Sequence, residues 1–183
     1  MLTDLPYTLT VDGEEKEIYS DFRNIILICN AFNDNTLTQS EKTRSMLDLL
    51  YVNDWCEFHD TQEAVKQAVW FIDWGKVYKE EIPENSPRVM DWEKDYNIII
   101  SAVNKNISGV ADIRSLEYMH WWTFLGYFTE RGECQFSTIT EIRDKLNKGK
   151  PLDKFEKQIL RENRDLIILK NKSNEEFEQE LWG

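Results

Sequence analysis

The sequence of 183 residues has few of the residues that interrupt secondary structure, with only seven glycines and four prolines. This scarcity argues against many short strands joined by tight turns, and it favours long helices. Aromatic residues, by contrast, make up 13% of the chain and hydrophobic residues 41%. That content is sufficient to fill a core, so we expect a folded chain of a length that suits one domain.

The sequence also lacks a run of basic residues. Asp and Glu number 34 against 22 Lys and Arg, which gives a formal charge of -12. Phosphate backbones and anionic membranes repel such a chain unless its basic residues gather on one face. Acidic residues interrupt the closest approach to such a run, Lys145 to Lys154, and we interpret it as a solvated helix face. We therefore expect neither nucleic acid nor a membrane as a partner.

Long hydrophobic runs and a cysteine framework are missing as well. No stretch approaches the ~20 apolar residues of a membrane-spanning helix. Residues 1–6 lack the basic and apolar regions of a signal peptide, so we expect none. The three cysteines, Cys29, Cys56 and Cys134, are isolated and odd in number. They indicate reduced thiols in a cytoplasm rather than a disulfide framework.

Residues that carry catalysis are scarce. The chain has two histidines and no glycine-rich phosphate loop. Cys56 and His59 are the nearest approach to a zinc site, but zinc sites need further paired ligands. His120 lies among aromatic residues without an acidic residue within one helical turn, so we interpret it as a core or near-core side chain. We predict that the protein is not an enzyme and has no catalytic residues, no cofactor and no metal.

Local patterns predict a mainly α fold. Residues 7–11 alternate with period two, Asp12-Gly13 suits a tight turn, and residues 15–19 form the return strand of a small β-hairpin. Capping residues and apolar spacing then predict about six to eight helices. Their approximate ranges are 21–32, 38–50, 60–75, 91–106, 116–130, 138–146, 152–169 and a short last segment, 173–182. Phe32 and Phe155 are expected on the apolar faces of their helices. Capping boxes are expected from Thr38 with Glu41 and from Thr138 with Glu141.

The chain shows no repeat and one candidate boundary. The breaker Gly149-Lys150-Pro151 separates a helical domain with the N-terminal hairpin, residues 1–149, from a C-terminal helical arm, residues 150–183. The arm is either separate or part of the same domain. Its last residues mix acids with Phe177 and Trp182, and such a segment docks either on its own domain or on another chain.

The sequence from Met119 to Leu125 resembles the Leu-His-Trp-Trp-x-Phe signature of the bacteriophage gene-product-fifteen family. Three weaker segments agree with that family in order, at residues 20–23, 91–95 and 138–143, so the resemblance runs from Leu5 to about Arg164. Met replaces the usual Leu at position 119, which is neutral for packing. Residues from 171 onward match nothing in the family.

The resemblance implies a role in phage tail assembly and transfers no catalytic residue. By gene position, family members resemble chaperones that coat the tape-measure protein until tail-tube subunits displace it. The implied partner is therefore the tape-measure protein, in the host bacterial cytoplasm, with a homo-oligomer or an upstream tail-assembly protein as further partners. The alternative is a structural head-tail connector or tail component that is retained in the virion and forms a ring through apolar surface.

The expected binding mode is capture of a partner helix in an apolar groove. The candidate protein-binding residues are Trp92, Trp121, Trp122 and Phe124, together with Phe177 and Trp182 of the last segment. A helical aromatic stripe more often packs into a core, and both interpretations stay open at this point. Trp121 and Trp122 are adjacent and cannot both point the same way, so one of them is the better candidate for an exposed contact.

Overall fold

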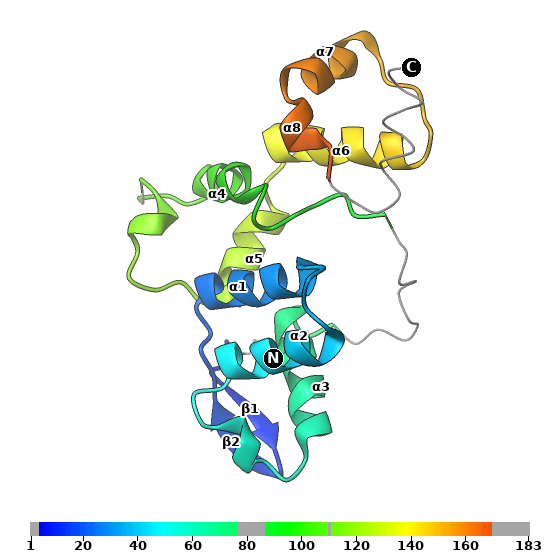
Figure 1. The fold of residues 1–183 in the computed structure, drawn as a ribbon. Helices are drawn as coiled ribbons and strands as arrows, with labels where there is room; N and C mark the ends of the chain where they lie inside the picture. The colour runs from blue at the N-terminus through cyan, green and yellow to red at the C-terminus, as the bar shows by residue number, and fades with distance from the viewer. Residues whose placement is uncertain (1–3, 77–86, 110, 170–183) are drawn as a thin grey trace. The chain divides into compact units, whose positions relative to one another are not determined.

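A computed structural model of the chain describes residues 4–76, 87–109 and 111–169 (Figure 1). These residues form eight α-helices, two short 3-10 helices and one two-stranded antiparallel sheet at the N-terminus. The predicted mainly α fold with an N-terminal hairpin is therefore confirmed. No helix among the described residues is both long and apolar enough to cross a membrane.

The chain divides into two compact units. The first comprises residues 1–80 and 103–131, and the second comprises residues 81–102 and 132–183. The boundary expected after residue 149 falls inside the second unit. The last helical segment, expected at residues 173–182, lies outside the described residues.

The first unit begins with the hairpin of β1 (Thr8–Val11) and β2 (Glu14–Glu17), in which Thr8 pairs with Glu17. Asp12 and Gly13 join the strands with φ values of 57° and 74°. Positive φ at both central residues is the geometry of the type I′ turn that Asp-Gly favours. The turn is therefore formed by the residues that the sequence indicates.

The tip of the hairpin is fastened to the start of a helix. The Asp12 carboxylate accepts hydrogen bonds from the backbone N–H groups of His59 and Asp60, each at 2.8 Å. These bonds hold the pKa of Asp12 below its usual value, with the bond from His59 as the largest cause. In return, the Glu63 carboxylate accepts the Asp12 backbone N–H at 2.8 Å. The hairpin therefore gains the larger partner that a two-stranded sheet needs.

Helices form the rest of the first unit. They are α1 (Phe22–Asn33), α2 (Gln39–Leu50), η1 (Trp55–Glu57), α3 (Thr61–Ile72), η2 (Ile113–Ser115) and α5 (Trp121–Thr129), while the division between the units crosses α4 (Tyr96–Asn104). Helix α1 packs against α2 and α5, and α3 packs against α2 and β1. The predicted capping box of Thr38 and Glu41 is present at the start of α2. Phe32, expected inside, is partly exposed at the end of α1.

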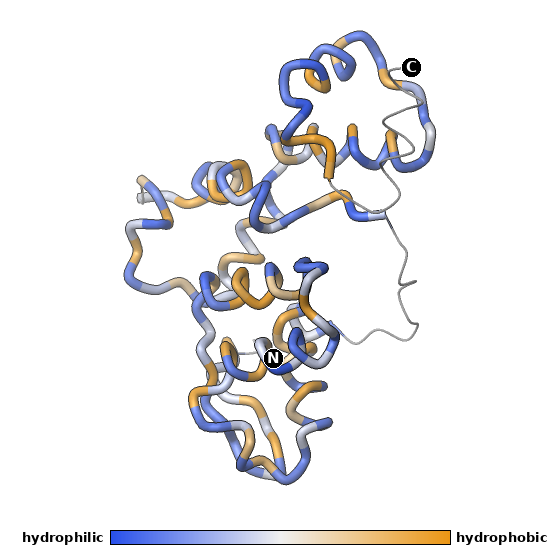
Figure 2. The backbone as a smooth tube through the Cα atoms, viewed as in Figure 1, coloured by the Kyte–Doolittle hydropathy of each residue, from blue (hydrophilic) through white to orange (hydrophobic). Residues whose placement is uncertain are grey.

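The second unit contains α6 (Gln135–Asn147), α7 (Lys154–Glu162) and α8 (Arg164–Ile167). Helix α8 packs against both α6 and α7. The small apolar core consists of Ile139, Ile142, Leu160 and Ile167. Figure 2 shows the end of α8 in the hydrophobic colour and α7 mainly in the hydrophilic colour.

A buried ion pair supplements this core. The Arg143 guanidinium binds the Asp95 carboxylate at 2.6 and 2.8 Å, and both side chains are almost fully buried. The remaining Arg143 N–H groups donate to three backbone carbonyl groups, at Val89, Leu166 and Ile167. One side chain therefore connects the segment before α4, helix α6 and the end of α8.

Two predicted helix starts are wrong. Helix α5 begins at Trp121 rather than at residue 116, because residues 119–121 pair with residues 20–22 through backbone hydrogen bonds. Helix α6 begins at Gln135, so Thr138 is not its cap. The Thr138 hydroxyl instead donates to the Cys134 carbonyl one turn earlier, a bond that threonine makes inside helices.

The long helix expected at residues 152–169 is interrupted. Asn163, with φ −125° and ψ 32°, separates α7 from α8, and its side-chain amide donates to the Ile159 carbonyl. Helix α7 turns Glu156 and Leu160 inward, so Phe155, expected on the apolar face, is 67% exposed.

Candidate functional site

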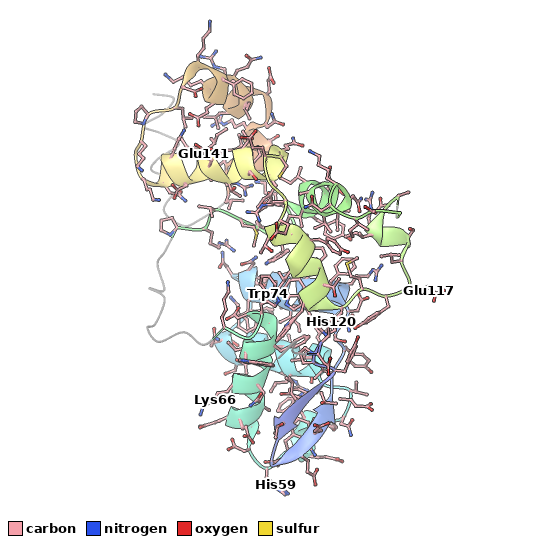
Figure 3. All side chains as sticks on the ribbon, turned by 180° about the vertical axis from the view of Figure 1, so that it is seen from behind. His59, Lys66, Trp74, Glu117, His120 and Glu141 are labelled. Atoms are coloured by element: carbon pink, nitrogen blue, oxygen red, sulfur yellow. The ribbon has the colours of Figure 1, made fainter. Side chains whose placement is uncertain are left out.

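The histidine of the Trp-Trp segment starts α5 (Figure 3). Its Nδ1 accepts the backbone N–H of Trp122 at 3.0 Å, as an N-cap side chain does. Its Nε2 lies 2.9 Å from the Pro6 carbonyl oxygen, which only accepts, so Nε2 carries the proton. Burial lowers the pKa of His120 below its usual value, although the Pro6 carbonyl opposes this shift. A neutral His120 therefore joins the N-terminal segment to α5.

The two tryptophans of this segment both cap the end of α3. The Trp121 indole donates to the Ile72 carbonyl, and the Trp122 indole donates to the Phe71 carbonyl, each at 2.8 Å. The indole of Trp121 gives the carbonyl of Ile72, the last residue of α3, a partner that the helix cannot supply. The Phe71 carbonyl also accepts the backbone N–H of Trp74 at 3.3 Å, so the Trp122 indole is its second donor. The adjacent tryptophans therefore have a structural role in the first unit.

Phe124 and Trp121 belong to the core. Phe124 is 0% exposed, and its ring stacks on Phe22 at 4.7 Å and on Trp121 at 5.5 Å. Trp121 is 1% exposed. For these two candidates the structure favours the core interpretation, because neither ring reaches the surface.

Trp122 is half-buried and belongs to a cluster at the end of α3. Its ring lies 5.3 Å from that of Trp70. Trp74, also half-buried, has a positive φ of 61° directly before Gly75, whose φ is 71°. A Cβ atom at Gly75 would lie 3.1 Å from Trp122 and 3.4 Å from Trp70, so this close approach requires glycine. We call Trp70, Trp74 and Trp122 the tryptophan corner.

The remaining candidates lie in the second unit or outside the described residues. Trp92 is half-buried in the turn before α4, in the second unit, where the Asp91 carboxylate accepts the backbone N–H groups of Glu93 and Lys94. Phe177 and Trp182 lie outside the described residues. Of the six candidates, the structure therefore describes only Trp121, Trp122 and Phe124 within one unit.

An exposed pair of tyrosines was missed by the sequence analysis. Tyr7 is 53% exposed and Tyr118 47% exposed, and the Tyr7 ring contacts His120 edge-on at 5.1 Å. The Tyr118 hydroxyl lies 2.7 Å from the Ser20 hydroxyl. Its pKa is raised, chiefly by burial and to a smaller extent by the neighbouring Tyr7. We call Tyr7 and Tyr118, with the exposed Leu5 beside them in the chain, the tyrosine patch.

The patch has an acidic rim. Asp4 and Glu117 are exposed directly beside Leu5 and Tyr118 in the chain. Figure 3 shows Glu117 on the segment that leads to His120. No sequence signal marked this surface, because residues 7 and 118 become neighbours only through the pairing of residues 20–22 with 119–121.

The titratable groups give no indication of chemistry. Burial raises the pKa of the Cys29 thiol to about 12, and the nearby Asp73 contributes in the same direction. Such a thiol is a poor nucleophile, because the thiolate is the reactive form. Within the described ranges, no three His, Cys, Asp or Glu residues gather in a way that could hold a metal ion.

These contacts define a mainly helical protein in which a His-Trp-Trp segment joins the N-terminal segment, α3 and α5. A family model described as Bacteriophage Gp15 protein matches residues 2–169. The chain therefore belongs to the bacteriophage Gp15 family, and its coarse functional class is that of a phage structural or morphogenesis protein. No curated protein and no solved structure gives a match.

Proposed function

We propose that this protein is a tail-assembly chaperone, which binds the tape-measure protein in the host bacterial cytoplasm while the tail is built. The observation that carries the proposal is the exposed tyrosine patch, held in place by His120 of the family segment. On this proposal the protein acts by binding and carries out no catalysis.

The chemistry of the patch suits reversible binding. Tyrosine offers a large apolar ring with a polar tip, so it remains compatible with water in the free protein and still contributes contact area in a complex. Tyr7 and Tyr118 form a small surface, which favours modest affinity. A chaperone that must later leave the tape-measure protein requires such affinity.

Charge supports the choice of partner. In the described part of the first unit, 17 acidic residues face nine basic ones. This excess keeps copies of the protein apart and attracts a basic segment. The partner that fits is a helix with an apolar stripe and flanking Lys or Arg residues, which the acidic rim at Asp4 and Glu117 would receive.

The tryptophan corner is a second contact candidate in the same unit. Its half-buried rings combine apolar area with restricted motion, as residues at binding hot spots do. The tryptophan corner takes the place of the groove that was expected to include Trp121 and Phe124, because those two side chains are buried. Trp122 is the one of the two adjacent tryptophans that retains exposed surface.

The test is co-expression with the tape-measure protein of the same phage, followed by size-exclusion chromatography with light scattering. We expect a soluble complex with several copies of this chain per tape measure. The double variant Tyr7→Ala/Tyr118→Ala should lose the complex. Tyr19→Ala, which removes a ring with 47% exposure outside the patch, is the matched control and should retain it.

A different result would favour the alternative role. If no complex forms and this chain alone gives a discrete ring, the protein is better explained as a head-tail connector or tail component. Mass spectrometry of purified particles separates the two roles independently, because a connector stays in the virion and a chaperone does not.

A further inference from the structure

The exposed side of α7 carries three cations that have no acidic partner among the described residues. Lys154, Lys157 and Arg161 are exposed and are spaced by three and four residues, so they follow one side of the helix. None of them forms an ion pair within the described part of the chain. The nearby Lys145 and Lys148, by contrast, are paired with acids of the second unit.

An aromatic ring lies beside these cations. Phe155 is 67% exposed, the largest exposure among the large hydrophobic side chains described. It cannot turn inward, because Glu156 and Leu160 occupy the buried side of α7. We call Lys154, Phe155, Lys157 and Arg161 the α7 ridge. An isolated exposed ring needs no explanation, but one that directly follows Lys154 on a helix with three exposed cations suits an acidic segment with apolar side chains.

The same chain contains such a segment. Residues 175–182 read Glu-Glu-Phe-Glu-Gln-Glu-Leu-Trp, with four acids and three large apolar residues. Glu176 and Glu180 are four residues apart, as are Phe177 and Leu181. In a helical conformation, that spacing would place each pair on one side. The described residues of the second unit include ten acids and ten bases, and Lys154, Lys157 and Arg161 are bases that form no ion pair with those acids.

The chain is long enough to make the contact within one molecule. Helix α8 packs against α7, and Leu169, two residues after α8, is buried. The six residues from Leu169 to Glu175 span up to about 20 Å when extended. Helix α7 has nine residues and is therefore about 13 Å long. The linker can therefore be longer than the ridge, and such tethering raises the effective concentration of the segment.

We propose that residues 175–182 dock on the α7 ridge of their own chain. Their glutamates lie beside Lys154, Lys157 and Arg161, and their apolar side chains cover Phe155. This inference is independent of the tape-measure partner, because it concerns a contact within one chain.

The test measures amide hydrogen exchange of residues 175–182 in the full-length protein. We expect slower exchange than in a free peptide of the same sequence. The variant Lys154→Glu/Lys157→Glu should accelerate exchange of this segment by about fivefold, since it removes two surface ion pairs and adds repulsion. The matched control, Lys66→Glu/Lys105→Glu, makes the same charge change at two exposed lysines of the first unit and should leave the rate unchanged. Figure 3 shows Lys66 on α3, far along the chain from the ridge.

A charge swap completes the design. Adding Glu176→Lys/Glu180→Lys to the ridge variant should restore slow exchange, whereas an effect of misfolding would not be reversed. Exchange of the wild-type segment at the rate of the free peptide would overturn the proposal, as would equal effects of ridge and control variants. Protection that grows with protein concentration would also overturn it, because the ridge would then bind a second copy.

Discussion

The two units of this protein are stabilised in different ways. The first contains stacked aromatic rings and two indole N–H groups that cap α3, and it carries an excess of acids. The described residues of the second include equal numbers of acids and bases, and Arg143 holds its segments together from the interior. The His-Trp-Trp segment, residues 120–122, therefore accounts for contacts that stabilise the first unit but not for those that stabilise the second.

The difference has an energetic consequence. The first unit is stabilised by contacts among many aromatic rings, each of which contributes little. The loss of one such contact therefore lowers its stability only slightly. In the second unit, a single guanidinium satisfies one buried carboxylate and three carbonyl groups. Removing it leaves several buried polar groups unpaired at once, which is far more costly than losing one exposed contact.

Arg143→Ala should have the largest effect. The buried Asp95 would lose its partner, and breaking such a pair costs about 3–5 kcal/mol. Amide exchange should rise in α6, α7 and α8 and stay unchanged in α1 and α3. Arg44→Ala is the control, since its pair with Asp48 is exposed and contributes about 0.5 kcal/mol or less. Equal loss of amide protection in both units would contradict the conclusion that Arg143 stabilises the second unit alone.

Gly75→Ala is the next largest change, and it acts on the first unit. Alanine at φ 71° costs about 1–2 kcal/mol, and its Cβ would also press on Trp122. Thermal unfolding should show a lower midpoint. Gly126→Ala in α5 is the matched control: a Cβ there meets nothing within 4 Å, so the substitution should stabilise the helix by roughly 0.5–1 kcal/mol. Destabilisation by both variants would contradict this account of Gly75.

Features set by residues close in sequence could be predicted. The Asp12-Gly13 turn and the Thr38 capping box depend on contacts within four residues, and both are present. The start of α5 could not be predicted, because it depends on the pairing of residues about 100 positions apart. Propensity favoured a helix from residue 116, and a backbone partner from a distant segment outweighed it.

The candidate site was predicted less well for the same reason. Trp121 and Phe124 are aromatic residues at helical spacing, and a short window does not reveal whether such rings face a core or solvent. The carbonyl groups that accept the two indole N–H bonds lie 49 and 51 residues away. Tyr7 and Tyr118 carry no local pattern, and only the folded chain brings them near His120.

Trp122→Phe should lower the stability less than Arg143→Ala or Gly75→Ala does. It keeps an aromatic ring in the tryptophan corner and removes the hydrogen bond to the Phe71 carbonyl, which costs about 1 kcal/mol. Faster amide exchange at the end of α3 would report the loss. Trp55→Phe is the control, because the Trp55 indole donates to the exposed carboxylate of Asp48, which water can replace. An equal response to the two substitutions would argue against a capping role for Trp122.

The smallest expected effect is a pH dependence confined to the first unit. The pKa of His120 is lowered from its ordinary value of 6.5, chiefly by burial, so folding favours the neutral ring. Its contribution to stability is therefore fully present above pH 6.5 and is lost as the pH falls from 6.5 through the lowered value. A proton on Nδ1 would also remove the acceptor for the Trp122 N–H. Urea unfolding between pH 7.5 and 5.5 should show weakening of the first unit. His120→Asn, which keeps an N-cap acceptor without a titrating ring, should flatten that dependence. An unchanged slope in this variant would assign the pH dependence to other groups.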